Sequence, residues 1–595
     1  MDPSQGHEFL PAWEGHPVWQ RTEALQAAVE RGQAGQDFKS NLEDLLKSLV
    51  PDQAEELLML GQEGRGAFAL MLVPASGSLL FVGDSLSGTI TALAKVGFEL
   101  TVCDHDPARL EFARQRDAAW SPGQVHHVQV APGGPFPFAP KSFEVVVAEL
   151  GPAGEAPLWG AHASILHGLA RDSFVWVTDN ALGYKRALGR RGKFAYQTPW
   201  SMLRRLLHPS PGEGTRAAQR RELAGSFGTS ACLALYPHRL ESSHVVHLDQ
   251  ALPRLTVGPK ERRNRLKLLA NKVGAFPWLA PSFAWIARRE PRPTAPRLQR
   301  ILDELSERLQ APRLLPEHLI ASRGNVAVVQ TTRTQGHGGW TLHVPLCRHK
   351  SRLVVRHFDW LQRLRTEHPN VPVPEPLYAG TCQGLYLSVE ERLPGHHAPQ
   401  LSDGSLAQQR MLRDVARSLP QLAHGPRRIL DADELERLLG DRIRRVLRLC
   451  GRSDTARRIQ RMWDQAHEAL LGHTYQPVVY HADLRPKHVQ VDHEGSLQGF
   501  MDWGACEAHF LPYVDLLHLV AHRRSESARL QWERWQTGGL EAWEAEVLAE
   551  YRQTMQLDPQ VAQALESLYP VLVAGMAERN WEFSRPYWVH KVFGL

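Results

Sequence analysis

Several features are scarce in this chain of 595 residues, and each absence excludes a class of protein. The six cysteines are scattered with no CxxC pair, which excludes a disulfide framework and a cysteine zinc site and favours a reducing compartment. No run of about 18 apolar residues occurs, so no membrane-spanning helix is expected. The N-terminus, MDPSQGHEFLPAWEG, has neither the basic start nor the apolar core of a signal peptide, and we expect a cytoplasmic protein.

An excess of one charge is also missing. The 69 Lys and Arg residues against 64 Asp and Glu residues leave a formal net charge of +5, and the basic residues form no long block. We therefore expect no nucleic-acid partner. The chain has no G-x-S-x-G elbow, no Walker loop and no His pair at i, i+4 around an acid, which argues against a serine hydrolase, a P-loop nucleotidase and a zincin.

What is present is enough apolar sequence for more than one core. Hydrophobic residues make up 43% of the chain, and the length predicts two or more domains. The clearest seam is ARREPRPTAPRLQR at 287–300, where three prolines within six residues exclude a continuous helix or central strand. The predicted organisation is a helical lead-in without an assigned role at 1–50, a first domain at 51–290, a linker at 291–300 and a second domain at 301–595.

In the first domain, strand-like and helical segments alternate, which predicts a parallel sheet with crossover helices. The segment LLFVGDSLSGTITALAKVGFELTVCDHDPARLEFARQR begins with an apolar strand that ends at Gly83. A turn of small residues and a helix from about Gly88 follow, and a second strand ends in Asp104. A tight turn lets the backbone approach a ligand, and an acid at the next strand end can accept hydrogen bonds from ribose hydroxyls.

This segment resembles the start of the class I S-adenosylmethionine-dependent methyltransferases, and the resemblance covers roughly residues 55–290. It implies an α/β Rossmann-like fold and a cofactor site formed by Gly83, Ser85, Ser87 and Asp104. The family pattern is G-x-G-x-G, whereas the second and third positions here are serines. A side chain at the second position crowds the methionine part of S-adenosylmethionine, so two interpretations stay open: a working methyltransferase, or a domain that keeps only the fold.

In the second domain, a strand-rich stretch at 316–346 precedes a mainly helical region beyond about residue 405. Within it, VYHADLRPKHVQVD at 479–492 is followed by FMDWG. Phosphoryl transfer depends on positioning and charge neutralisation. One carboxylate must face the incoming hydroxyl, and another must hold Mg²⁺ against the phosphates. Two spaced motifs that each present an aspartate predict this chemistry more strongly than a lone His-x-Asp.

These motifs resemble those of the aminoglycoside phosphotransferase and choline kinase family, an α+β branch of the protein-kinase-like fold, in which H-G-D-x-x-x-x-N precedes I-D-W or I-D-F. The resemblance implies that Asp483 is the catalytic aspartate, that His481 braces the loop and that Asp502 binds metal. His488 stands where the family has the asparagine that binds the second metal. It is either an unusual metal ligand or a mark of altered turnover, since Mg²⁺ prefers oxygen donors.

The resemblance also implies an ATP site. LYLSVEERLPG is similar to the hinge between the lobes, so the backbone near Glu390 and Glu391 would face adenine. His343, in WTLHVPL, occupies the position of the lysine that pairs the phosphates, and Lys350 would replace it only in another register. The glycine-rich cover is reduced to SRGN at 322–325.

Together the resemblances imply a bifunctional transferase. One activity would be ATP- and Mg²⁺-dependent phosphorylation of a hydroxyl on a small molecule or glycan, and the other S-adenosylmethionine-dependent methylation, as in bacterial enzymes that modify the ends of surface polysaccharides. The alternative is a catalytically degraded methyltransferase and pseudokinase that acts as a binding or scaffold protein. A third possibility is a methyltransferase with a regulatory pseudokinase. The sequence indicates neither the acceptor nor the oligomeric state.

Overall fold

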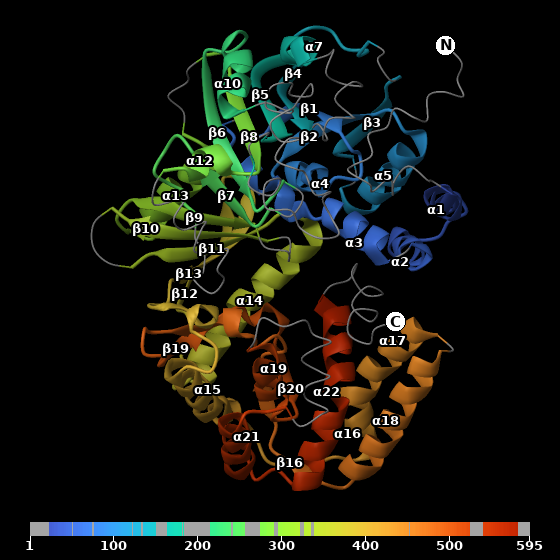
Figure 1. Ribbon diagram of the computed structural model, residues 1–595, viewed down its shortest axis with the longest axis vertical. Coiled ribbons are helices and arrows are strands. Elements are labelled where there is room, and N and C mark those ends of the chain that lie inside the picture. Colours follow the sequence, from blue (N-terminus) through green and yellow to red (C-terminus); the bar gives the residue numbers. More distant parts are fainter. Residues whose placement is uncertain are drawn as a thin grey trace, which may run out of the picture. The chain divides into compact units, whose positions relative to one another are not determined.

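The computed structural model describes residues 23–49, 51–73, 76–121, 123–131, 135–149, 163–180, 183, 215–239, 242–255, 274–290, 295–321, 326–334, 338–451, 453–523 and 539–580 (Figure 1). The expected glycine cover at 322–325 lies outside these residues. The chain divides into two units. The first comprises Met1–Val257, Arg265–Arg352 and Ala379–Ser388, and the second comprises Gly258–Asn264, Leu353–Tyr378 and Val389–Leu595.

The first unit begins its sheet with five parallel strands in the order β3-β2-β1-β4-β5. Their apolar sequences, such as GSLLFVG in β1, are buried, as expected for a parallel sheet covered on both faces. The strand order reverses between β1 and β4, and such a switch point is where α/β sheets bind ligands. The strands are β1 (Gly77–Gly83), β2 (Phe98–Asp104), β3 (Val125–Gln129), β4 (Phe143–Glu149) and β5 (Ala170–Asp179).

Helices connect these strands as the alternating pattern predicted. The Ser87 hydroxyl caps α4 by accepting from the Thr89 N–H group, and Asp106 caps α5 ahead of Pro107. In the N-terminal segment, Phe38 packs against Phe112 of α5 with ring centroids 5.1 Å apart. The helices are α1 (Glu23–Gln33), α2 (Phe38–Ser48), α3 (Pro51–Leu60), η3 (Glu63–Met71), α4 (Gly88–Lys95), α5 (Pro107–Trp120), α7 (Ala163–Leu169), α10 (Arg216–Ala224), α12 (Phe276–Leu279) and α13 (Arg297–Arg308).

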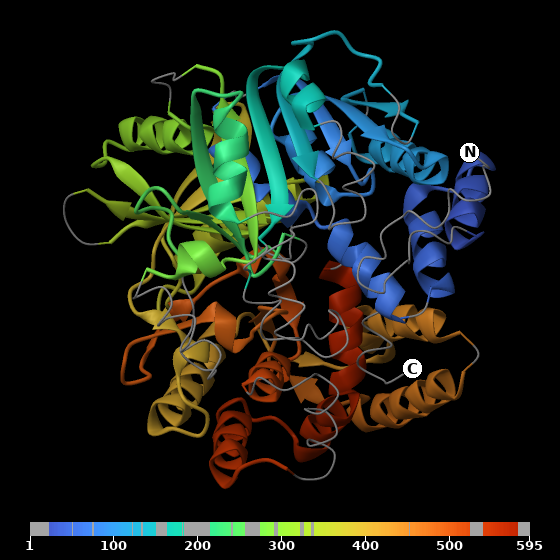
Figure 2. The ribbon, with the colours of Figure 1, turned by 45° about the horizontal axis from the view of Figure 1, so that its top comes forward.

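The sheet does not end with the parallel strands. It continues through antiparallel neighbours in the order β5-β8-β6-β7-β9-β10-β11-β13-β12 to form a thirteen-stranded sheet (Figure 2). The pairing of β7 with β9 joins the segments on either side of the proline-rich seam, with Val245 opposite Leu319. These strands are β6 (Thr229–Tyr236), β7 (His244–His247), β8 (Ser282–Arg288), β9 (Leu314–Ala321), β10 (Val326–Arg333), β11 (Trp340–Pro345), β12 (Pro376–Cys382) and β13 (Leu385–Glu391).

The expected linker at 291–300 is only partly within the described residues, which resume at Ala295. Helix α13 begins inside that stretch, at Arg297, because Leu298, Ile301, Leu302 and Leu305 form a buried stripe at helical spacing. The Arg297 guanidinium donates to the backbone carbonyls of Val96 and Gln383, both in the first unit. The domain boundaries at 290 and 301 stay a prediction, but the hydrogen-bonded sheet continues past them.

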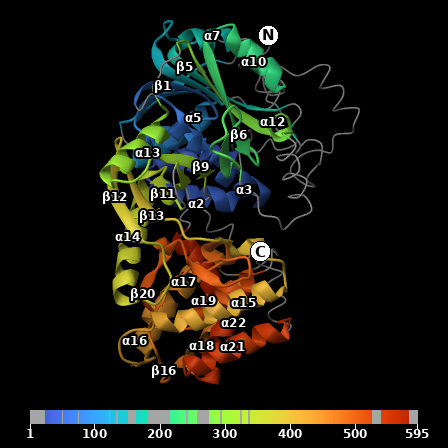
Figure 3. The ribbon, with the colours of Figure 1, turned by 90° about the vertical axis from the view of Figure 1, so that its left-hand side faces the viewer.

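The second unit is mainly helical, and its short strands carry the loops with the two aspartate motifs (Figure 3). Helices α17, α18 and α22 pack against one another, and α15 packs against α21. Its helices are α14 (Arg348–Glu367, which begins in the first unit), α15 (Leu406–Ser418), α16 (Ala432–Leu435), α17 (Asp441–Cys450), α18 (Asp454–Leu470), α19 (Val514–His522), α21 (Ala542–Thr554) and α22 (Pro559–Asn580). Its strands are β14 (His396–His397), β15 (Arg428–Ile429), β16 (Thr474–Tyr475), β17 (Val478–Tyr480), β18 (Val489–Val491), β19 (Leu497–Phe500) and β20 (Glu507–Phe510). Among the described helices of the whole chain, none combines the length and apolar character needed to cross a bilayer.

Candidate active site

The loop between β17 and β18 carries His481, Ala482 and Asp483 and is held by a buried carboxylate. The backbone N–H groups of His481 and Ala482 donate to the two oxygens of Asp515, at 2.7 and 3.1 Å. Burial raises the pKa of Asp515 to about 7, although its N–H donors favour the ionised form. Ala482 has φ of +67°, a left-handed conformation that a residue with a Cβ rarely adopts. Asp515, in the first turn of α19, therefore fixes a strained turn at the start of the loop.

His481 braces a second segment. Burial lowers its pKa to about 4, so the ring is neutral at pH 7, and Nε2 donates to the carbonyl oxygen of Met501 at 2.9 Å. Met501 directly precedes Asp502, which is also in the left-handed region, at φ 64° and ψ 59°. The side chain of Asp502 is 60% exposed, whereas His481 is completely buried. The ring thus connects the two predicted aspartate motifs.

Asp483 lies among cations and histidines. The Arg485 guanidinium donates to Oδ2, and Nε2 of His518 is 3.5 Å from Oδ1. Desolvation alone would raise the pKa of Asp483, but the Arg485 charge and His518 hold it well below its usual range. Asp483 is consequently ionised near neutral pH, as required of a carboxylate that orients a hydroxyl and accepts its proton.

His488 links the two aspartates. Its Nδ1 atom lies 2.7 Å from the backbone carbonyl oxygen of Asp483, and its Nε2 atom lies 3.1 Å from Oδ2 of Asp502. One ligand atom from each of these three residues falls within 4.8 Å of the others. The structure thus brings Asp483, His488 and Asp502, predicted from separate motifs, into one cluster.

The three residues predicted to contact the nucleotide differ in burial and in their contacts. Glu390 is buried, and its carboxylate lies 2.6 Å from Nε2 of His357. Glu391 is exposed, and its backbone N–H donates to the carbonyl oxygen of Glu375. His343 lies half-buried on β11 in the first unit, opposite Val328 of β10.

Lys350 does not share the strand of His343. Strand β11 ends at Pro345, and Lys350 lies in the first turn of α14. It is buried in the first unit, where burial raises the pKa of Glu63 to about 7 against the Lys350 charge. The lysine alternative in another register therefore does not hold.

Three residues at the loops were not predicted. Arg485 was within the quoted motif but had no assigned role, while His518 lies three residues after Asp515 on the same face of α19. That i, i+3 spacing is a signal that could have identified His518. His357, on α14, accepts the backbone N–H of Trp503 at Nδ1, and no local pattern pointed to it.

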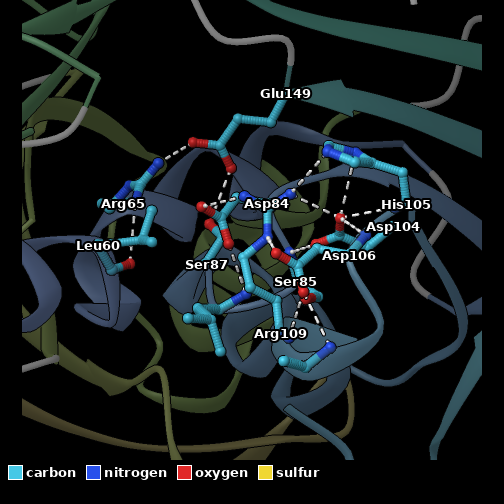
Figure 4. A network of polar contacts seen from close by, with 12 residues as sticks. Leu60, Arg65, Asp84, Ser85, Ser87, Asp104, His105, Asp106, Arg109 and Glu149 are labelled. Atoms are coloured by element: carbon cyan, nitrogen blue, oxygen red, sulfur yellow. Dashed lines mark hydrogen bonds and ion pairs between the residues drawn. The ribbon is translucent and has the colours of Figure 1, made fainter. Parts of the chain in front are cut away.

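In the first unit, the residues predicted to bind S-adenosylmethionine lie at the carboxyl ends of β1 and β2 (Figure 4). Gly83 has φ of +154°, and a Cβ on it would approach the carbonyl oxygen of Glu149 to 2.6 Å. The Ser85 N–H donates to Oδ2 of Asp104, and the Ser87 hydroxyl donates to Oε2 of Glu149, both at 2.9 Å. These residues do come together, and the Ser85 N–H and the Ser87 hydroxyl are hydrogen-bonded to carboxylates of the same unit.

The carboxylate of Asp104 is hydrogen-bonded to groups of its own unit. Its Oδ1 atom accepts from the backbone N–H groups of His105 and Asp106 at 2.7 and 3.1 Å, and from Arg109 Nη2 at 2.7 Å. The side chain is completely buried. Although burial favours the neutral acid, Arg109 and the Ser85 N–H keep the pKa of Asp104 below its ordinary value. Because the oxygens meant for ribose hydroxyls are occupied by the chain itself, these residues do not fit the cofactor.

The short strands and loops of the second unit bring Asp483, His488 and Asp502 into one cluster. Residues 320–556 match the family model described as the phosphotransferase enzyme family (APH), which supports a kinase-like fold for this part of the chain. The match begins on β9 and includes the strands up to β13. Among curated proteins, no sequence matches the chain.

Solved structures with some likeness include a macrolide 2'-phosphotransferase type I, 20% identical, covering 43% of this chain and 83% of that one, with a TM-score of 0.31. Another is the macrolide 2'-phosphotransferase MphH from Brachybacterium faecium, at 16% identity, 48% and 97% coverage, and a TM-score of 0.33. A putative methyltransferase from Bacillus halodurans C-125 has 11% identity, 38% and 99% coverage, and a TM-score of 0.23.

Proposed function

We propose that the chain transfers a phosphoryl group from a nucleoside triphosphate to a hydroxyl of a small molecule or glycan. The observation that carries this proposal is the cluster of Asp483, His488 and Asp502, with ligand atoms within 4.8 Å of one another. A catalytic carboxylate and a metal-binding carboxylate at such proximity are the two parts that phosphoryl transfer requires.

Each aspartate has a separate role in this proposal. Asp483, kept ionised by Arg485, orients the acceptor hydroxyl and accepts its proton. Asp502, with its side chain 60% exposed, holds a divalent ion such as Mg²⁺, which neutralises phosphate charge when bound. The buried His481 keeps the two loops in register through the Met501 carbonyl.

Because the acceptor is unknown, the test of phosphoryl transfer starts with the nucleotide. ATP and GTP hydrolysis is measured first, and transfer is then sought with a panel of sugars, glycans, aminoglycosides and macrolides. Asp483→Asn should abolish transfer and leave nucleotide binding nearly intact, because the amide keeps the shape and loses the base. Asp464→Asn, an exposed change on α18, is the matched control.

Unchanged turnover in Asp483→Asn would remove Asp483 from the reaction. A protein that binds neither nucleotide nor divalent ion would instead support the scaffold alternative. The proposed function does not include methylation, because the carboxylate of Asp104 already accepts hydrogen bonds from three backbone N–H groups and Arg109 of its own unit.

A further inference from the structure

The imidazole of His488 is fixed in one orientation. Its Nδ1 atom contacts the carbonyl oxygen of Asp483, a group that only accepts, so Nδ1 carries a hydrogen and Nε2 is the ring nitrogen that remains to bind a metal. The backbone is also held, since the His488 N–H donates to the carbonyl oxygen of Arg485 at 2.8 Å and the His488 carbonyl accepts from the Met501 N–H at 2.9 Å. Hydrogen bonding of one ring nitrogen to a carbonyl is how proteins orient metal-binding histidines.

The second nitrogen points at the metal-binding carboxylate. Nε2 of His488 is 3.1 Å from Oδ2 of Asp502. A nitrogen and an oxygen ligand each about 2.1 Å from one ion, at a right angle, lie about 3 Å apart. The observed separation therefore suits two adjacent ligands of a single ion. His488 is buried, whereas Asp502 is largely exposed, which leaves the outer positions of such an ion open to phosphate oxygens.

We propose that His488 Nε2 and Asp502 Oδ2 together bind one divalent ion, and that the nitrogen ligand shifts preference from Mg²⁺ to Mn²⁺ or a later transition metal. This proposal rests on the proposed phosphotransferase function of the same site. Mg²⁺ selects oxygen donors, whereas imidazole suits transition metals. On this proposal, the histidine at position 488 changes which metal ion the site prefers, and the site still binds a metal.

The test observes the ligand directly. Mn²⁺ alone, and Mn²⁺ with adenosine diphosphate, are added to the full chain, and electron spin-echo envelope modulation detects nitrogen bound to Mn²⁺. The wild type should show imidazole nitrogen coupling, and His488→Asn should lose it. Mn²⁺ affinity should fall about tenfold or more in that variant, with a smaller change for Mg²⁺. His493→Asn, an exposed change in the next loop, should match the wild type.

Equal nitrogen coupling in the wild type and His488→Asn, or no Mn²⁺ binding to the wild type, would overturn the proposal. His488→Gln serves as a second variant if the asparagine protein does not fold. Asp483→Asn separates the two proposals, because it should lose transfer while keeping the nitrogen coupling. If Asp483→Asn loses transfer but keeps the nitrogen coupling, Asp483 takes part in the reaction and is not needed for metal binding by His488.

The first unit contains buried arginine–carboxylate pairs at the ends of its parallel strands. Three of the five parallel strands, β2, β4 and β5, end in a carboxylate paired with an arginine of the same unit: Asp104 with Arg109 at 2.7 Å, Glu149 with Arg65, and Asp179 with Arg239 at 3.2 Å. All six side chains are buried. Burial lowers the pKa of Arg65, which also donates to the carbonyl oxygen of Leu60. Each of these strand-end carboxylates thus has an arginine of its own unit as a charge partner.

The start of α4 is covered as well. A Cβ on Gly88 would come within 2.3 Å of the backbone of Gln62, so the segment before η3 lies directly on this helix N-terminus. In nucleotide-binding α/β folds, the ligand lies at the strand ends and at this helix N-terminus. Both places are occupied by protein here.

We infer that arginine–carboxylate pairs fill the strand-end site of the first unit, which takes no nucleoside cofactor and serves as a structural core. S-adenosylmethionine and S-adenosylhomocysteine at millimolar concentration should give no heat in titration calorimetry and no shift of the melting temperature. Arg65→Ala should lower the melting temperature more than the Arg65→Met, Glu149→Leu double variant, since the single change removes the closest cation from the buried Glu149 and leaves only the Ser87 hydroxyl and the more distant Arg239 beside it. Binding of either cofactor, or an unaltered melting temperature in Arg65→Ala, would overturn the inference.

Discussion

The Nε2 atom of His357 lies 2.6 Å from Oε2 of Glu390, and this contact fixes the tautomer of the ring. Nδ1 of the same ring accepts the backbone N–H of Trp503 at 3.0 Å, so Nε2 carries the hydrogen and donates it to Glu390. One side chain on α14 thereby joins the hinge segment to the residue that follows Asp502. The geometry of the metal-binding loop depends on a helix far from it in the sequence.

Replacing His357 should loosen that loop. His357→Phe keeps a ring but removes the acceptor of the Trp503 N–H and a hydrogen-bond donor to Glu390, at a cost of about 1–3 kcal/mol for each lost hydrogen bond. We expect a lower melting temperature and weaker divalent-ion binding, measured by thermal unfolding and titration. Asp359→Asn, exposed on the same helix, is the control. A double-mutant cycle with Glu390→Gln that gives no coupling energy would contradict the contact.

Ala482 offers a test of backbone strain. At φ of +67°, glycine removes the Cβ conflict but loses more chain entropy, so Ala482→Gly should change the free energy of unfolding by less than about 1 kcal/mol. Ala482→Val places a β-branched side chain in the same conformation and should cost about 1–3 kcal/mol. Denaturant unfolding of the two variants checks this. Equal stability would show that the turn is not left-handed.

Arg485 should control the acid side of the pH profile. Desolvation raises the pKa of Asp483 while Arg485 lowers it, so Arg485→Ala should move the acid limb of kcat/KM toward neutral pH. Nucleotide hydrolysis measured across pH gives the profile, and Arg461→Ala, exposed on α18, is the control. An identical acid limb in Arg485→Ala and wild type would mean that Asp483 does not set it.

The buried His167 predicts acid sensitivity of the first unit. Burial, with a contribution from Arg289, lowers its pKa from 6.5 to about 4, and its ring centroid lies 4.5 Å from that of Phe174. The unfolded chain binds the proton more readily, so this stabilisation is full above pH 6.5 and is lost as pH falls toward 4. A shift of this size is worth roughly 3 kcal/mol at most. His167→Gln should flatten the melting temperature between these pH values, and an unchanged slope would contradict the assignment.

The sequence predicted positions well where a short pattern determines the backbone. Strand β1 ends at Gly83, α4 opens at Gly88 and β2 ends at Asp104, as the alternating pattern indicated. Likewise, Asp483 and Asp502 meet because each lies two or three residues after the end of a short strand of the same unit. These relationships are local, so a single sequence contains the information.

Partners that come from elsewhere in the chain were not predictable in the same way. No sequence pattern near Glu149 indicates that it forms an ion pair with Arg65. The prediction that Asp104 binds ribose likewise did not consider Arg109, in the first turn of α5, as its partner. Side-chain occupancy depends on three-dimensional packing, which spacing alone does not give. His488 lies between the two cases: its position was predicted, but its two hydrogen-bonding directions required the structure.

The pairing of β7 with β9 has a consequence for modularity. The family match starts on β9, yet the edge of that strand is hydrogen-bonded to β7, more than sixty positions earlier and before the proline-rich seam. A fragment beginning at residue 301 would leave the apolar β9 with an unpaired edge, a surface prone to association with other strands. The matched segment is therefore hydrogen-bonded to a strand that precedes the seam. An exchange of this half of the chain would keep that pairing only if it included β7 as well.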